Sequence, residues 1–343
     1  MRITLSFATT ADGYLDDNSA TRLVLSSEED WAEVHRLRAQ CDAILVGAET
    51  VRRDNPSLKG VATRVTVTRS GRLDPAARFF TVGEARRIVF APHPLPQLAD
   101  VAEVICLKEP ITAAAMVVEL ERRGIGHLLV EGGAEVLGMF LDEGLADTVR
   151  RAVRPDLVLG VERGGARFCY TPPANRPCHS EVLGGVEVTT CRLKEDRSEE
   201  ELQWLDRAIE ESRRCPICQS CYRVGAVIVT ADGQSFTGYT HESSPTHHAE
   251  QEAIIKAVQA GAELRGATIY TSMEPCSKRA SEPESCTELI LRYGFARVVF
   301  ACYEPDCFVC CEGALRLRRA GVEVRVYPER REEVLAINGH LFG

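Results

Sequence analysis

The sequence has no long apolar run, no excess of positive charge and few aromatic residues. No segment of its 343 residues approaches the ~20 consecutive apolar residues of a membrane-spanning helix, so we expect no contact with a membrane. The opening stretch MRITLSFATTADGYLDD has neither a long apolar core nor a cleavage site, and we therefore expect no signal peptide and a cytoplasmic location. The formal net charge of −9 argues against a non-specific polynucleotide binder, but it allows a small anionic substrate in a locally basic pocket.

Cysteine, in contrast, is abundant and unevenly distributed. Five of the 14 cysteines precede residue 200 and nine follow it. Because nothing in the sequence indicates export, this usage favours metal ligation or buried thiols over a disulfide framework. The length of the chain predicts two domains, since a domain typically has about 100–200 residues.

Four residues in the second half have the order and chemistry of a catalytic zinc site. They are His248 and Glu250 in the segment HHAE, then Cys276 after a proline, and finally Cys286. One imidazole and two thiolates leave the fourth position of tetrahedral Zn²⁺ open for water. In nucleobase deaminases a glutamate two residues after the histidine transfers the proton of that water without binding the metal. The alternative is that these side chains are ordinary buried residues, but four independent positions would then coincide by chance.

Apolar β-branched runs alternate with helical patterns along the whole chain. This alternation predicts an α/β fold in both halves, with a largely parallel sheet in the first. In the first half we expect strands at 3–8, 42–47, 64–68, 87–91, 104–107, 127–130 and 184–192, and helices at 27–40 and 112–123. In the second half we expect strands at 224–230, 267–271, 297–301 and 323–326, and helices at 199–212, 248–260, 286–293 and 313–320.

The segment GATIYTSMEPCSKRASEPESC, residues 266–286, resembles the deaminase domain of the riboflavin-pathway diaminohydroxyphosphoribosylaminopyrimidine deaminases. The long insert between Cys276 and Cys286 is the riboflavin-type feature, because related deaminases usually separate these cysteines by only two residues. Within the insert, Lys278 and Arg279 either face the substrate's phosphate or form a solvated basic loop. The sequence departs from the family before the strand at 224, where Cys221-Tyr222 replaces an Asn-Pro pair that includes a substrate-binding asparagine.

A second group of cysteines has spacings that suit a structural zinc site. Two residues separate Cys215 from Cys218, and two separate Cys218 from Cys221. Cys310 is a candidate fourth ligand. A structural zinc site needs four ligands. The alternative, which we favour because the family does not require a second metal, is a set of unligated thiols near the active site.

The first half resembles the 5-amino-6-ribosylaminouracil 5′-phosphate reductase domain. The resemblance covers most of residues 1–190 and rests on ATTADG (8–13), VHRLRAQCDAILVGAETVRRDNPSL (34–58) and LLVEGGAEVLGMFLDEGLAD (128–147). It implies a dihydrofolate-reductase-like fold that uses NADPH. It further implies cofactor binding by Gly47, Thr50, Thr68, Arg69, Gly132 and Gly133, and substrate binding by Asp54 and Glu131. Without the resemblance, Glu131-Gly132-Gly133 is equally compatible with an ordinary strand-to-helix turn.

Two positions depart from that reductase family. Ser6 stands where the family commonly has a lysine, six residues before Asp12. The family also commonly has an arginine shortly after Asp-Asn-Pro that helps to hold the substrate phosphate, and here the chain continues as Leu-Lys-Gly-Val up to Val61. Lys59 is a candidate replacement. Otherwise the reductase substrate differs, or this domain is weakly active.

Both halves thus resemble domains of one bifunctional enzyme, but in reversed order. We expect a reductase domain at 1–192, a linker at 193–200, and a cytidine-deaminase-like three-layer α/β/α domain at 201–343. The expected cofactors are Zn²⁺ and NADPH, the expected partner is a small-molecule pyrimidine, and we expect a homodimer. Alternatives are a related enzyme acting on another pyrimidine or purine, a nucleic-acid base deaminase, and a thiol-rich interaction protein. The acidic charge and the reductase-like half disfavour a nucleic-acid substrate.

Overall fold

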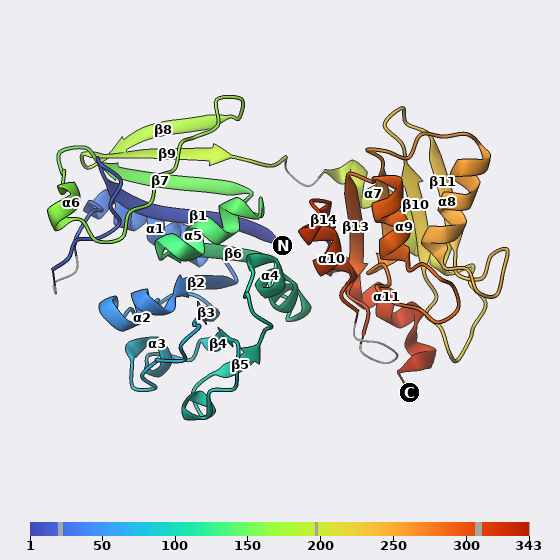
Figure 1. Cartoon of the computed structure of the whole chain (residues 1–343), viewed down its shortest axis with the longest axis horizontal. Coiled ribbons are helices and arrows are strands. Elements are labelled where there is room, and N and C mark those ends of the chain that lie inside the picture. Colours follow the sequence, from blue (N-terminus) through green and yellow to red (C-terminus); the bar gives the residue numbers. More distant parts are fainter. Residues whose placement is uncertain (20–22, 196–197, 306–310, 343) are drawn as a thin grey trace. The chain divides into compact units, whose positions relative to one another are not determined.

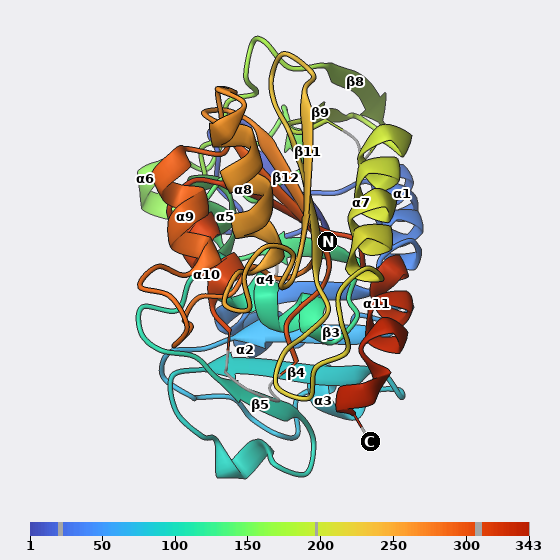
Figure 2. The same ribbon diagram turned by 90° about the vertical axis from the view of Figure 1, so that its right-hand side faces the viewer.

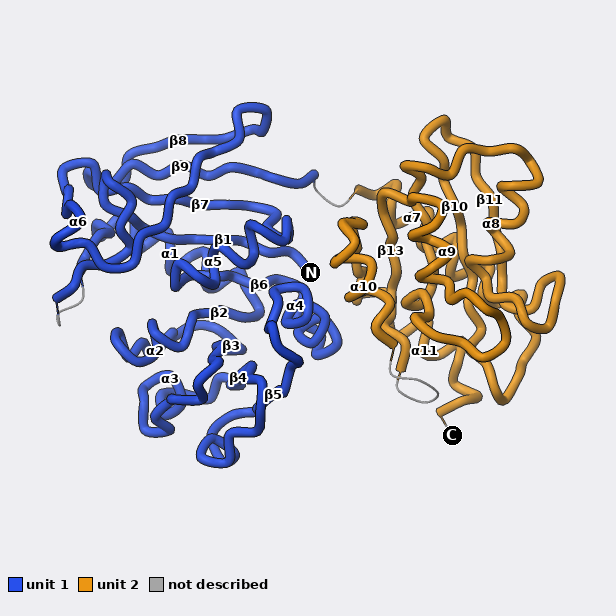
Figure 3. Tube along the Cα trace, viewed as in Figure 1, with its two compact units in different colours: residues 1–195 blue, residues 196–343 orange. Residues whose placement is uncertain are grey.

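The computed structural model describes residues 1–343 except 20–22, 196–197, 306–310 and 343. The chain folds into two compact units, residues 1–195 and 196–343 (Figure 3). Their boundary falls inside the segment 193–200, which we expected to be the linker.

Unit 1, residues 1–195, is built on a nine-stranded sheet with the strand order β5-β4-β3-β2-β6-β1-β7-β9-β8 (Figure 1). The strands from β5 to β7 run parallel, whereas β9 is antiparallel to both β7 and β8. The strands are β1 (Arg2–Thr10), β2 (Ala43–Gly47), β3 (Thr63–Val67), β4 (Arg86–Ala91), β5 (Glu103–Cys106), β6 (His127–Gly132), β7 (Thr148–Arg154), β8 (Cys178–Leu183) and β9 (Val186–Arg192). The helices are α1 (Glu28–Ala39), α2 (Ala48–Asp54), α3 (Arg78–Thr81), α4 (Ala113–Arg122), α5 (Ala134–Asp142) and α6 (Gly160–Arg163), with a 3-10 turn at Pro96–Leu98.

The local sequence explains where the main elements of unit 1 begin. All five residues of β2 are buried, as expected for a strand covered on both faces. The helix α1 starts after Ser27, whose side chain accepts a hydrogen bond from the Asp30 amide, and α4 starts after Thr112 in the same way. These caps fix the first turns of the helices that cover the parallel strands.

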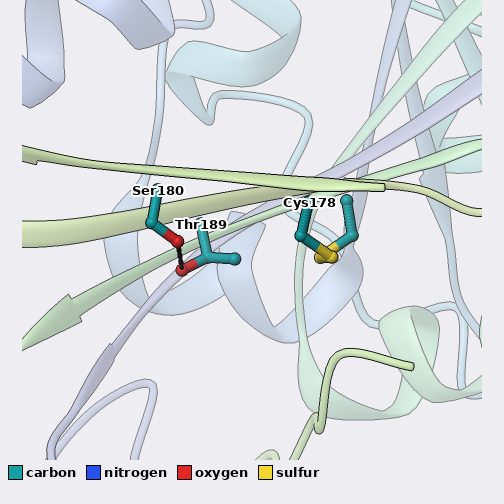
Figure 4. Close-up of a disulfide and its surroundings, with 4 residues drawn as sticks. Cys178, Ser180 and Thr189 are labelled. Carbon is teal, nitrogen blue, oxygen red and sulfur yellow. Dashed lines mark hydrogen bonds between the residues drawn. A yellow bond between two sulfur atoms is a disulfide. The ribbon is translucent and has the colours of Figure 1, made fainter. Parts of the chain in front are cut away.

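The β8–β9 hairpin carries a disulfide that the sequence analysis did not anticipate. Cys178 and Cys191 lie directly opposite each other in the antiparallel register, with Cα atoms 4.1 Å apart, and their sulfur atoms are bonded (Figure 4). Next to them, the hydroxyls of Ser180 and Thr189 hydrogen-bond across the strands at 3.1 Å (Figure 4). The expectation of thiols without disulfides was therefore wrong for this pair. The pairing was missed because β8 is exposed along nearly its whole length and lacks the apolar alternation that indicates a strand.

Unit 2, residues 196–343, contains a five-stranded mixed sheet with the order β11-β10-β12-β13-β14. Its strands are β10 (Gly225–Val229), β11 (Ser235–Tyr239), β12 (Thr268–Met273), β13 (Arg297–Cys302) and β14 (Glu323–Val326). Its helices are α7 (Glu199–Ser212), α8 (Ala249–Gln259), α9 (Cys286–Tyr293), α10 (Gly313–Arg319) and α11 (Arg331–Ile337), with 3-10 turns at Pro328–Arg330 and Gly339–Leu341.

The helices of unit 2 form two layers around this sheet. Figure 2 shows α7 and α11 on one face and α8 and α9 on the other. Buried residues of α7 and α11, such as Leu205 and Val334, pack in one core with Val299 of β13. The expected three-layer α/β/α arrangement is therefore confirmed. Among the helices of the described residues, none has the length and apolarity needed to cross a membrane.

Candidate active sites

The four residues of the expected zinc site come together in unit 2. His248 is the N-cap of α8, Glu250 lies in the first turn of that helix, and Cys286 is the first residue of α9. Cys276 lies in the loop that follows β12. The ligand atoms of His248, Cys276 and Cys286 all lie within 4.8 Å of one another, and within the described residues these three side chains form the one cluster that suits a metal ion.

Local hydrogen bonds hold the two cysteines in place. Ser285 caps α9 through a reciprocal capping box with Glu288, which fixes the helix start at Cys286. The amide of Cys286 donates to the Cys276 sulfur at 3.3 Å, and Thr287 Oγ1 donates to the Cys276 carbonyl at 2.9 Å. The start of α9 thus positions one sulfur and binds the backbone that carries the other.

The surroundings of the cluster favour the thiolate form of Cys276 and raise the pKa of the Glu250 carboxyl. The hydrogen bond from Cys286 lowers the pKa of Cys276, against the opposing effect of burial, and His248 lowers it further. Burial raises the pKa of Glu250, and the neighbouring Cys276 adds to that rise. Glu250 is only 3% exposed and accepts a 3.1 Å hydrogen bond from Thr271 of β12.

The residues of this cluster fit a catalytic zinc ion. One imidazole nitrogen and two sulfurs are a donor set that Zn²⁺ prefers, and three protein ligands leave a position for water. A carboxyl group that is buried next to this position suits proton transfer. The assignment rests on the donor set and its geometry.

The two basic residues of the insert differ in their surroundings. Lys278 is exposed, whereas Arg279 is partly buried and donates from Nε to the Glu284 carbonyl at 2.6 Å. The pKa values of His248 and Cys286 are both raised overall, and Arg279 lies near enough to the cluster that its charge opposes each rise. Its Nη1 is buried without a hydrogen-bond partner among the described residues. Of the two, Arg279 is therefore the better placed to meet an anionic substrate.

The extra cysteines do not assemble a metal site within the described residues. Cys215 donates to the Val224 carbonyl at 3.2 Å, Cys218 lies 3.2 Å from the Ser220 hydroxyl, and Cys221 lies 3.9 Å from Nδ1 of His241. Burial raises the pKa of the Cys221 thiol to about 12. Cys310, the fourth candidate, lies outside the described residues. The preference for unligated thiols over a second zinc site stays a prediction.

The residues expected to bind cofactor and substrate in unit 1 surround one cavity of about 1000 Å³. Its walls include all eight of them: Gly47, Thr50, Asp54, Thr68, Arg69, Glu131, Gly132 and Gly133. They come from the ends of β2, β3 and β6 and from α2. Ser6, which departs from the reductase pattern, and Lys59, the candidate replacement for the missing arginine, also line this cavity, whereas Val61 is buried in the core.

One end of the cavity has the features of a dinucleotide site. Gly133 precedes α5 with φ +81°, a conformation that side chains other than glycine rarely adopt, and its Cα lies close to Gly47. The amides at the start of α5 face this end of the sheet, where helix N-termini commonly bind phosphates. Arg69 lies nearby with its side chain 62% exposed, in an ion pair with Glu135. Glycine turns and an exposed arginine at one end of a cavity are features that suit a phosphate-bearing dinucleotide.

Glu131 has a partner that was not predicted from the sequence. Arg38 of α1 donates from Nε and Nη2 to the two carboxylate oxygens of Glu131, each at 2.7 Å, and both side chains are nearly buried. The guanidinium of Arg38 also lies over the ring of Trp31 at 5.6 Å. Glu131 is therefore part of a bidentate pair rather than a free acceptor. In the sequence, only the helical periodicity of α1 indicates that Arg38 lies on the face of the helix that packs against the sheet, and this periodicity alone does not predict its partner.

Together, the two units define a class of protein in which a reductase-type α/β domain is joined to a zinc deaminase-type domain. Residues 1–172 match the RibD C-terminal domain, and the chain belongs to this family. Residues 198–302 match the cytidine and deoxycytidylate deaminase zinc-binding region, which includes His248, Glu250, Cys276 and Cys286. The domain that is C-terminal in the family's name lies at the N-terminal side here, so the reversed order is confirmed.

Some relatives that are named for an enzymatic activity match one unit or the other. A diaminohydroxyphosphoribosylamino-pyrimidine deaminase from Schizosaccharomyces pombe is 39% identical over 142 residues, which are 40% of this chain and 35% of that protein. A 2,5-diamino-6-ribosylamino-4(3H)-pyrimidinone 5′-phosphate reductase from Archaeoglobus fulgidus is 31% identical over 201 residues, which are 52% of this chain and 90% of that protein. Among solved structures, a Thermotoga maritima diaminohydroxyphosphoribosylaminopyrimidine deaminase/5-amino-6-(5-phosphoribosylamino)uracil reductase is 26% identical, with a TM-score of 0.48 and 56% of both chains covered.

The match to the S. pombe deaminase spans only 35% of that relative's length. Zn²⁺ and NADPH, the two cofactors expected from the sequence, are those of the two matched families.

Proposed function

We propose that this chain deaminates a riboflavin-pathway ribosylaminopyrimidine 5′-phosphate and reduces its ribosyl group to a ribityl chain with NADPH. The observation that carries the proposal is the pairing of a buried Glu250 with the His248, Cys276 and Cys286 cluster, in a chain whose other unit has a dinucleotide-sized cavity. The relatives named above, which match one unit or the other, support both steps.

In the deamination step, Glu250 transfers protons. When bound, the zinc ion supplies Lewis acidity that makes water a nucleophile near neutral pH. Glu250 takes a proton from that water and delivers it to the ring nitrogen, and a further proton goes to the departing amino group. The C–N bond to the amino group breaks, a C–O bond forms, and ammonia leaves. Thr271 keeps the Glu250 carboxyl at the wall of the site, and Arg279 provides positive charge for the phosphate.

In the reduction step, the residues of unit 1 bind and orient the two reactants. NADPH, when bound, supplies the reducing equivalents. Gly47, Gly132 and Gly133 allow its backbone contacts, and Thr68 and Arg69 lie where the adenosine 2′-phosphate is expected. Asp54 and the Arg38–Glu131 pair line the same cavity and contact the pyrimidine substrate.

The test measures both products from one purified protein. Ammonia release and loss of NADPH absorbance are followed with the phosphorylated aminopyrimidine and with its dephosphorylated form. We expect turnover of the phosphorylated compound in both assays. Absence of turnover with this compound would overturn the proposed substrate.

One observation favours a second candidate, a related enzyme that acts on a different pyrimidine or purine. Val61, at the place where the reductase family commonly has a phosphate-binding arginine, is 9% exposed and belongs to the apolar core. Lys59, two residues earlier in the chain, lies in the cavity wall. Turnover of the dephosphorylated substrate alone would favour this candidate.

We propose further that the protein acts as a homodimer in the cytoplasm. Closed two-fold dimers are the commonest assembly of such enzymes, and sedimentation equilibrium would measure the mass. The cytoplasm keeps thiols reduced, which suits buried free cysteines such as Cys276, Cys286 and Cys302. The Cys178–Cys191 disulfide argues against such a location, and mass spectrometry of alkylated protein from cells would measure whether it forms there.

A further inference from the structure

A buried ion pair lies in the wall of the unit 1 cavity, outside the residues assigned so far. Arg150 of β7 donates from Nη2 to Oδ1 of Asp30 in the first turn of α1. The side chains are 6% and 1% exposed, respectively. Both residues line the cavity, together with Ser6, which is paired with Arg150 in the register of β1 and β7.

The pair leaves one carboxylate oxygen unused. Oδ2 of Asp30 is buried and has no hydrogen-bond partner among the described residues. A buried acceptor without a donor is costly, and an ionised one more so, because it has lost its contact with water. Such a group in the wall of a binding cavity is satisfied when a ligand brings a donor to it.

The position of the pair indicates which ligand brings that donor. The residues proposed to bind the dinucleotide lie at the ends of β2, β6 and β3. Arg150, in contrast, belongs to β7, which pairs with β1, and Asp30 is bound to Arg150. In the strand order β3-β2-β6-β1-β7, β7 is four strands from β3, a distance of roughly 19 Å at the usual spacing between strands. The pair therefore lies at the end of the cavity away from the 2′-phosphate, on the side left for the second reactant.

We propose that Asp30 is a substrate-binding residue of the reductase unit, whose free oxygen accepts a hydrogen bond from an N–H or O–H group of the aminopyrimidine substrate. Arg150 is a positioning residue that holds the carboxylate of Asp30 in this orientation. Ser6, which carries no charge, lies beside Arg150 in the register of β1 and β7. This inference rests on the proposed function, because it names a contact with the substrate of that reaction.

The experiment compares Asp30→Asn with the wild type in two binding measurements. The first is titration with NADPH, and the second is titration with the deaminated phosphoribosylaminopyrimidine in the presence of NADP⁺. We expect unchanged NADPH binding, while the Kd for the pyrimidine rises about tenfold or more, as for loss of a hydrogen bond to a charged group. In turnover, KM for the pyrimidine should rise more than kcat falls. Glu28→Gln, an exposed position on the same helix, is the matched control and should change neither Kd.

A second variant separates binding from folding. Asp30→Asn alone leaves Arg150 as an uncompensated buried charge, so the double variant Asp30→Asn/Arg150→Gln removes both charges and keeps two amides that can bond to each other. It should bind NADPH and show the same weakened pyrimidine binding. Unchanged pyrimidine binding in either variant overturns the inference and leaves the proposed function intact. Loss of NADPH binding in both variants also overturns it, because Asp30 would then be structural. A wild type that does not bind the pyrimidine overturns the proposed function itself, and the inference with it.

Discussion

Thr271 donates a hydrogen bond of 3.1 Å from its hydroxyl to Oε1 of Glu250. Thr271 lies in β12 and Glu250 in the first turn of α8, so this contact joins the central strand of unit 2 to the helix that also carries His248. Both residues of the contact are almost fully buried. The carboxyl group is therefore held beside the metal cluster by the core of the sheet.

This contact makes Glu250→Gln an informative substitution. The amide oxygen of glutamine still accepts the Thr271 hydrogen bond, so the fold and the metal ligands should remain. The amide cannot carry a proton between water and the base, and we expect ammonia release to fall by about 10²–10⁴-fold. Zinc content, measured by mass spectrometry, should not change.

The control for this substitution is Glu332→Gln, at an exposed position of α11 away from the cluster. It should release ammonia at the wild-type rate. Ammonia release that persists in Glu250→Gln would contradict the role of Glu250 as proton carrier.

The number of zinc ions per chain tests the two metal predictions together. We expect one zinc in the wild type and one in a Cys215/Cys218/Cys221→Ser variant, because within the described residues only His248, Cys276 and Cys286 form a metal cluster. Cys276→Ser should lose most of the zinc, since it removes one of three protein ligands. A fall from two zinc ions to one in the triple variant would instead establish the structural site.

The zinc cluster was predictable because a few residue types in a fixed order along the chain indicate a catalytic zinc site. His248 and Glu250 share one helix start, and Cys286 begins the next helix, so local patterns place three of the four side chains. The alternation of apolar runs likewise predicted strands such as β2 and β13, whose residues are buried on both faces.

Contacts between distant polar residues were not predictable in this way. β7 has the sequence TVRRAVR, in which three arginines interrupt the apolar pattern that indicates a strand. Arg150 of this strand is buried because Asp30, 120 residues earlier, neutralises its charge. The bidentate pair of Arg38 and Glu131 joins residues 93 positions apart. No local pattern marks such pairs, because each partner alone is an ordinary surface residue type.

Gly133→Ala tests the dinucleotide end of the cavity. The backbone at Gly133 has φ +81° and ψ 121°, a region that is nearly restricted to glycine, so an alanine there costs about 1–3 kcal/mol or shifts the turn. We expect the Kd for NADPH, measured by fluorescence titration, to rise about tenfold or more. Gly138→Ala in the same helix α5 is the control, because nothing lies within 4 Å of the position its Cβ would take. It should bind NADPH normally, and equal NADPH binding by both variants would contradict the assignment of this turn.

The stability of unit 2 should depend on pH through Glu323 at the start of β14. Its carboxylate accepts 2.8 Å hydrogen bonds from Nε of both Arg297 and Arg325. Burial alone would raise the pKa of Glu323, but the two guanidiniums outweigh it and hold the pKa below its ordinary value. A lowered pKa in the folded state means that the ion pairs stabilise the fold above the ordinary pKa of glutamate, and that this contribution is lost as the pH falls through the lowered value.

Glu323→Gln should therefore destabilise unit 2 at neutral pH and make little difference in acid. We expect the free energy of unfolding to fall by about 1 kcal/mol near pH 7, a modest value because the Glu323 side chain remains 29% exposed. In acid, once the pH has fallen below the lowered pKa of Glu323, the two proteins should unfold at similar urea concentrations. The measurement uses a Trp31→Phe background, so that Trp204 alone reports on unit 2. The control Glu332→Gln should unfold like the wild type at neutral and at acidic pH. If Glu323→Gln destabilises unit 2 equally at both, packing rather than charge is responsible.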